Sequence, residues 1–109
     1  MRTLKFIVEG QVISQDPNCD FSKLVPGSEG YIQAEFSFSP EWDGYTKVVA
    51  FFSNLGREFE PQKLDYKSTC IIPAEVLKRS IFKIQVVGQK GSNKLRTNKV
   101  VVRQRGDNV

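Results

Sequence analysis

Two strand-like aromatic segments joined by a tight turn constrain the fold of this chain more than any other feature. Phenylalanine alternates with serine over residues 36–39, and the apolar segment 47–52 follows the turn. Pro40 ends the first segment because it lacks a backbone donor, and Asp43 and Gly44 tolerate the positive φ of a tight turn. Trp42, the only tryptophan, lies within this turn. The pattern predicts a β-fold with Trp42 in its core and indicates no chemistry.

The rest of the chain repeats short strand patterns separated by turn residues. Residues 31–38 give the clearest half-buried strand, and residues 73–79 predict one or two helical turns that begin with Pro73. Gly10 is expected to form a bulge, and residues 88–91 or 88–93 a hairpin turn. About seven strands with one short helical turn favour an all-β, immunoglobulin-like antiparallel β-sandwich. The expected strands are 2–9, 11–14, 31–38, 46–53, 64–72, 81–87 and 94–103.

The sequence predicts one domain that is made in a cytoplasm and stays there unless it leaves inside an assembled particle or through lysis. The chain has 109 residues and 39% hydrophobic content, enough for a core, and we expect a single domain over 1–109 with a flexible tail from about residue 104. The longest apolar run, 48–52, is much shorter than the roughly 20 residues of a membrane helix. The N-terminus alternates charged and apolar residues, unlike a secretory signal. We therefore expect no membrane partner.

Residues that carry out catalysis or hold metals are scarce in this chain. It has no histidine, and its two cysteines, Cys19 and Cys70, are predicted to be free thiols, the first near the surface and the second buried. Glu41 and Asp43 flank Trp42, but their spacing suits a turn better than acid–base catalysis. We therefore predict that the protein is not an enzyme and that it has no catalytic residues, no cofactor and no metal site.

Charge divides unevenly between the two halves of the sequence. Residues 1–61 contain five basic and nine acidic side chains, whereas residues 62–109 contain eleven basic and three acidic ones. This division favours an anionic partner or complementary subunit contacts, and the alternative is a basic edge that serves solubility. Nucleic acid would bind weakly, nonspecifically and with strong salt dependence. The Arg-Gly-Asp tripeptide at 105–107 matches an integrin-recognition motif and is interpreted as accidental.

Three short segments together resemble a known kind of module. They are the turn at 38–44 with the segment 47–52, the Ile-Pro-Ala-Glu-Val-Leu stretch at 72–77, and Val87-Gly88 with the return at 95–98. Over most of residues 3–103 the chain resembles the small β-sandwich modules encoded by bacteriophages, similar to the N-terminal domain of baseplate upper proteins and to related head or tail proteins. The resemblance implies a virion building block that docks onto neighbouring subunits. Since no stalk or receptor-binding part follows, a decoration or accessory protein is expected.

The leading hypothesis is therefore a non-enzymatic structural or accessory protein of a phage virion, either a head decoration or a tail or baseplate module. It would be made in the bacterial host cytoplasm, would act through contacts with other virion subunits or with itself, and is expected to be a homo-oligomer or part of a particle. The alternative is a phage-encoded inhibitor that binds a bacterial host defence protein, as anti-CRISPR proteins do. The residues predicted to contact a partner are Lys47, Val49, Phe51, Lys90, Lys94, Arg96, Lys99 and Arg103.

Overall fold

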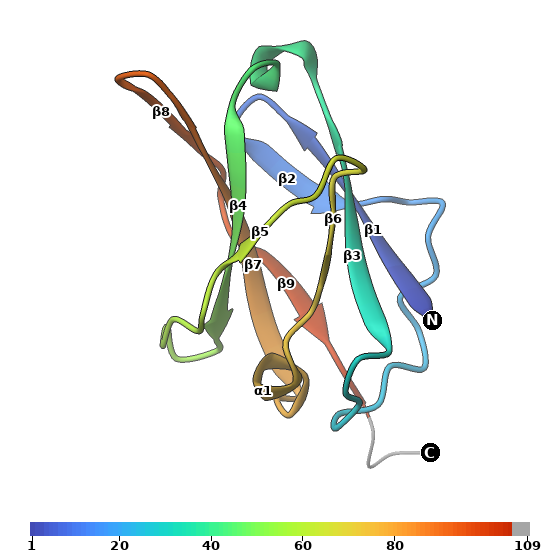
Figure 1. Cartoon of the computed structure of the whole chain (residues 1–109). Coiled ribbons are helices and arrows are strands. Elements are labelled where there is room, and N and C mark those ends of the chain that lie inside the picture. The colour runs from blue at the N-terminus through green and yellow to red at the C-terminus, as the bar shows by residue number, and fades with distance from the viewer. Residues whose placement is uncertain (106–109) are drawn as a thin grey trace.

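The computed structural model describes residues 1–105 and shows two β-sheets packed face to face, with one short helix at an end (Figure 1). Sheet A has the strand order β2-β1-β3-β6, and sheet B has the order β5-β4-β7-β8, with β9 also paired to β7. The predicted all-β sandwich is confirmed. The elements are β1 (Arg2–Glu9), β2 (Val12–Gln15), β3 (Ile32–Phe38), the 3-10 turn η1 (Pro40–Trp42), β4 (Thr46–Ser53), β5 (Gln62–Lys63), β6 (Thr69–Ile71), α1 (Ala74–Leu77), β7 (Ile81–Lys90), β8 (Asn93–Arg96) and β9 (Val100–Arg103).

The first and third strands lie side by side in sheet A and run parallel, so the prediction of a purely antiparallel sandwich is wrong at this pair. The long loop 16–31 returns the chain to the starting end of β1, where the Arg2 N–H donates to the Tyr31 carbonyl at 2.8 Å. Leu24 anchors the loop in the core. The parallel register places Phe6 beside Phe36, and their rings stack with centroids 5.4 Å apart.

In sheet B, β7 pairs with β8 near one end and with β9 near the other. The prediction of one returning strand over 94–103 is therefore wrong at 97–99. Thr97 stays beside β7, because its Oγ1 accepts the Val86 N–H and its carbonyl accepts the Gln85 side chain. Asn98 turns to sheet A, where its Oδ1 accepts the Ile13 N–H at 2.8 Å. The break thus ties the two sheets together.

The strand predicted over 64–72 is also wrong in its first half, because residues 64–68 form the turn between β5 and β6 and only Thr69–Ile71 is a strand. The Asp65 carboxylate accepts the N–H groups of Lys67 and Thr69 and the Thr69 hydroxyl, and Ser68 has a positive φ of 59°. Hydrogen bonds from the Thr69 side chain and backbone lower the pKa of Asp65 below its ordinary value. A short polar side chain that bonds its own backbone favours a turn over a continuous strand.

Three smaller predictions also need correction. Gly10 has a φ of +56° in the turn between β1 and β2 and does not form a bulge. Pro73 is the N-cap of α1, not its first helical residue. The predicted flexible tail is wrong at Gln104, which is buried and donates to the Leu77 and Arg79 carbonyls, and at Arg105, whose N–H donates to the Leu24 carbonyl. The other tail positions lie outside the described residues.

Trp42 is fully buried, as predicted, and closes one end of the sandwich. Its Nε1–H donates to the Gly10 carbonyl at 2.8 Å, which joins the η1 turn to the β1–β2 turn. Its ring lies against the backbone of β7, since a Cβ added at Gly88 would stand 2.8 Å from Trp42 Cζ3. Trp42 therefore packs between the two sheets and requires a glycine in β7.

Candidate protein-binding surface

Two residues predicted to contact a partner lie in the core instead. Val49 and Phe51 are both 0% exposed, because these alternate positions of β4 point toward sheet A. Neither side chain can reach a partner, so this part of the predicted contact set is wrong. Outward-facing positions on β4 are Thr46, Val48, Ala50 and Phe52.

Lys47 and Lys90 lie at the end of the sandwich that Trp42 closes. Lys47 follows the inward row of β4, where its Nζ stands 5.1 Å from the Phe38 ring centroid and donates to the Tyr45 carbonyl. Lys90 Nζ lies 5.7 Å from the Tyr45 ring centroid and 3.4 Å from the Asp43 carbonyl oxygen. Both ammonium groups are engaged by the chain itself, which makes them weak candidates for a partner contact.

The other four predicted contact residues, Lys94, Arg96, Lys99 and Arg103, share one surface. Directly paired residues of antiparallel strands point to the same side of a sheet. Lys94 pairs with Gln89, Arg96 with Val87 and Arg103 with Ile81, all on the side of β7 opposite its core residues. Lys99 Nζ lies 3.9 Å from the ring centroid of Phe52 on the same side. We call this side the outer face of sheet B.

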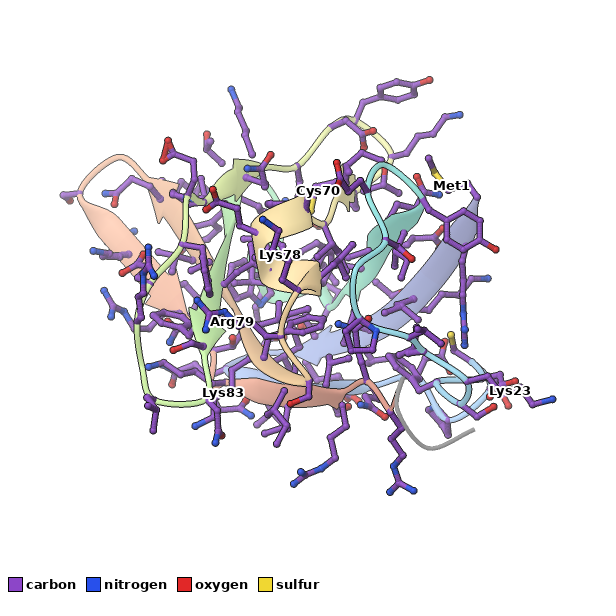
Figure 2. The ribbon with its side chains drawn as sticks, turned by 90° about the horizontal axis from the view of Figure 1, so that it is seen from below. Met1, Lys23, Cys70, Lys78, Arg79 and Lys83 are labelled. Atoms are coloured by element: carbon purple, nitrogen blue, oxygen red, sulfur yellow. The ribbon has the colours of Figure 1, made fainter. Side chains whose placement is uncertain are left out.

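Sequence reasoning missed two cations of this outer face. Lys63 pairs with Val48, and Lys83 pairs with both Phe52 and Val101. Figure 2 shows Lys83 directed away from the ribbon. The sequence did not show which alternate residues of β4 face outward, because that strand is apolar on both faces.

An apolar floor lies between these cations. Val48 and Val87 are paired neighbours on this face, and Phe52 is only 8% exposed beneath Lys99. Long lysine stems cover apolar surface while the charged ends stay in water, which explains how an outward-facing phenylalanine is buried. The outer face of sheet B therefore has an apolar centre with cations around it.

The charged residues on the strands of sheet B are all basic. Within residues 1–105, the strands of sheet B contain no Asp or Glu and carry seven cations, whereas those of sheet A carry two of each sign. Glu58 faces Phe52 across an isolated bridge and is a carboxylate at the margin of this face. The uneven charge of the two halves of the sequence therefore becomes a basic sheet. Its strand cations are Lys47, Lys63, Lys83, Lys90, Lys94, Arg96 and Arg103.

A second group of cations lies beside α1. The Cζ atoms of Arg57 and Arg79 each stand 5.5 Å from the ring centroid of Phe59. With Lys78 they line a hollow of about 300 Å³, and Figure 2 shows Lys78 and Arg79 near the helix. Glu75 lines the same hollow and supplies a countercharge, so this group is a weaker anion site than a surface without carboxylates.

The thiols and carboxylates form no reactive arrangement in the described part of the chain. Cys19 and Cys70 are free, as predicted, and half-buried. Burial raises the pKa of the Cys70 thiol to about 12, so it is protonated and a poor nucleophile at neutral pH. Residues 1–105 hold no group of three or more metal-ligating side chains and no helix long and apolar enough to cross a membrane.

The Arg-Gly-Asp tripeptide is only partly described. Arg105 is exposed two residues after the end of β9, while Gly106 and Asp107 lie outside the described residues. Comparison of the chain with protein-family models, curated proteins and solved structures found no match.

Proposed function

We propose that this protein is a non-enzymatic structural or accessory subunit of a bacteriophage particle, a head decoration or a tail or baseplate module. In this proposal it binds an acidic surface of a neighbouring subunit through the outer face of sheet B. The phage assignment rests on the sequence resemblance at the Trp42 turn, at 72–77 and at 87–98. The binding mode rests on the structure.

The observation that carries the binding mode is that the charged residues on the strands of sheet B are all basic. Six cations surround an apolar floor on its outer face: Lys63, Lys83, Lys94, Arg96, Lys99 and Arg103. Protein interfaces combine an apolar centre with a polar rim, and complementary charge raises the association rate and selects the partner. A copy of the same chain is a candidate partner, because the first 61 residues carry a net charge of −4.

The same face is a poorer match to nucleic acid. Proteins that bind single strands without sequence preference stack bases on exposed aromatic rings. The aromatic side chain of this face, Phe52, is buried beneath the Lys99 ammonium. Contact would therefore be limited to phosphates, and its affinity would fall steeply with salt.

Mass spectrometry of purified particles tests the structural role. Lysates of cells in which the chain is expressed during phage production are fractionated on a density gradient, and intact particles are digested and quantified. The proposal expects this chain in the particle fraction in a fixed ratio to a major capsid or tail protein. Its absence from particles, combined with a host protein co-purifying in a fixed ratio, would instead support the alternative of an inhibitor of a host defence protein.

A further inference from the structure

A cation-lined hollow of about 610 Å³ lies where the loop 16–31 meets the edge of sheet B. Its apolar lining comes from Phe21, Leu24 and Val101, and its cations are Lys23, Arg103 and Arg105. Gln15 and Ser22 complete the lining, so no carboxylate among the described residues contributes to it. Figure 2 shows Lys23 on the loop at the opposite side of that view from Lys83. Because Val101 and Arg103 belong to β9, the hollow is continuous with the outer face of sheet B.

The wall of the hollow formed by the loop 16–31 is held in place by hydrogen bonds from Arg2. The Arg2 guanidinium donates to the carbonyl oxygens of Asp20 at 2.9 Å, Ser22 at 2.6 Å and Lys23 at 3.3 Å. The Asp20 carboxylate accepts the Ser22 N–H at 2.8 Å, and bonds from Ser22 lower the pKa of Asp20. The Asp20 carboxylate therefore stabilises its own turn. The Lys23 backbone in the same loop has a positive φ of 59°.

The strand wall is tied to β2 and to the same loop. The Gln15 amide donates to the Val101 carbonyl at 3.0 Å, and the Arg105 N–H donates to the Leu24 carbonyl at 2.8 Å. Both walls are thus positioned before any ligand arrives, and less ordering is required when one binds. The floor is fixed as well, because Phe21 packs edge-on against Phe6 with ring centroids 5.4 Å apart.

We infer that this hollow binds an acidic peptide segment of the partner, with a carboxylate side chain between the cations and a neighbouring apolar side chain on the floor. This inference rests on the proposed function and names the anchor point of that contact. The volume falls within the range of roughly 300–1,000 Å³ typical of ligand pockets. An acidic peptide can use both the cations and the apolar floor of the hollow, whereas contact with a nucleic-acid backbone would use the cations alone.

The test uses the full chain and a fluorescein-labelled peptide in which glutamate alternates with leucine. Binding is followed by fluorescence anisotropy at physiological ionic strength and mapped by the amide shifts of the ¹⁵N-labelled protein. We expect shifts concentrated in residues 21–24 and 101–105. Arg103→Glu should weaken binding by about tenfold or more, as expected when one partner of a charge contact is reversed. Arg103→Gln should weaken it less, and the amide spectrum of each variant verifies folding.

Lys67→Glu is the matched control, because it makes the same charge change at an exposed position of the β5–β6 turn, outside the proposed binding face and the lining of the hollow. It should weaken binding by no more than about threefold, since exposed charges more than about 8 Å apart are largely screened at this ionic strength. Equal losses for Arg103→Glu and Lys67→Glu would overturn the hollow as a site and leave the proposed function standing. So would equal binding of a glutamine version of the peptide, no binding of either peptide, or displacement by a DNA oligonucleotide of equal charge. Absence of the chain from particles would defeat the proposed function instead.

Discussion

Sheets A and B have similar inner faces and different outer faces. Leu4, Phe6 and Ala34 of sheet A are buried against Phe51 and Ile84 of sheet B. On the outer side, sheet A pairs charges of opposite sign, since Lys5 stands beside Glu35. Sheet B places cations together without a carboxylate on its strands. The shared apolar interior stabilises the fold, and the cationic outer face is the part of the molecule that binding would explain.

The largest expected effect lies in the shared interior. Trp42→Ala removes a side chain that contacts both sheets and its hydrogen bond to Gly10, and should lower the free energy of unfolding by about 3–5 kcal/mol. Urea denaturation followed by circular dichroism measures this. Tyr66→Ala, at a 90% exposed position, is the control and should change stability little. A loss for Trp42→Ala no larger than that of the control would contradict the role of Trp42 in joining the sheets.

A smaller loss is expected where the ring of Trp42 meets sheet B. In Gly88→Ala the new methyl group would stand 2.8 Å from Trp42 Cζ3, and overpacking of this kind costs about 1–3 kcal/mol. Gln89→Ala, at the next and exposed position of β7, should be nearly neutral. In the Trp42→Phe background the cost of Gly88→Ala should shrink, because the atom that causes the clash is gone. Additive losses in a double-mutant cycle would place the strain elsewhere.

Charge reversals measured at low and high salt test the contrast between the outer faces. Lys83→Glu relieves repulsion among the cations of sheet B and should raise the melting temperature at low ionic strength, whereas Lys5→Glu places like charges opposite each other in sheet A and should lower it. Each change is expected to stay within about 0.5–1 kcal/mol. Thermal melts in 0.02 M and about 1 M NaCl should show both differences shrinking with salt. A change in melting temperature of the same sign for both variants would show that the two faces do not differ as described.

The smallest effect concerns the turn between β5 and β6. The pKa of Asp65 is lowered in the folded state, so its ionised form adds stability above the ordinary value of 3.8 and loses it as the pH falls through the lowered folded value. Asp65→Asn should therefore be less stable than the parent chain near pH 6, and the gap should narrow at about pH 2. Urea midpoints at the two pH values measure this. A gap that widens on acidification would contradict the assigned hydrogen bonds.

Local patterns were sufficient to predict most strands and the burial of Trp42, because alternation over 31–38 and the Pro40 stop depend on neighbouring residues alone. The turn at 64–68 was missed because the apolar residues on either side masked the bonds that the Asp65 side chain makes with the backbone of Lys67 and Thr69. The parallel β1–β3 pair depends on how the loop 16–31 crosses the end of the sandwich, which a local pattern does not contain.

The candidate site was predicted less well than the fold. The basic return over 94–103 was recognised from its composition, and four of its cations do share a face. Val49 and Phe51 were assigned to the surface because β4 is apolar on both sides, and only its register with β7 separates the inward row from the outward one. Lys63, Lys83 and the hollow beside Arg103 depend on strand pairing and on the return of the loop, so they required the structure.

Zero-length carbodiimide cross-linking in purified particles tests most directly whether sheet B is the contact surface. The reagent joins a lysine ammonium to a carboxylate in contact with it, and mass spectrometry identifies both residues. We expect Lys63, Lys83, Lys94 and Lys99 to form links to carboxylates of a neighbouring subunit, and Lys5 on the outer face of sheet A to form none. Links from Lys5, with the four sheet B lysines left unmodified by the neighbour, would contradict sheet B as the contact surface.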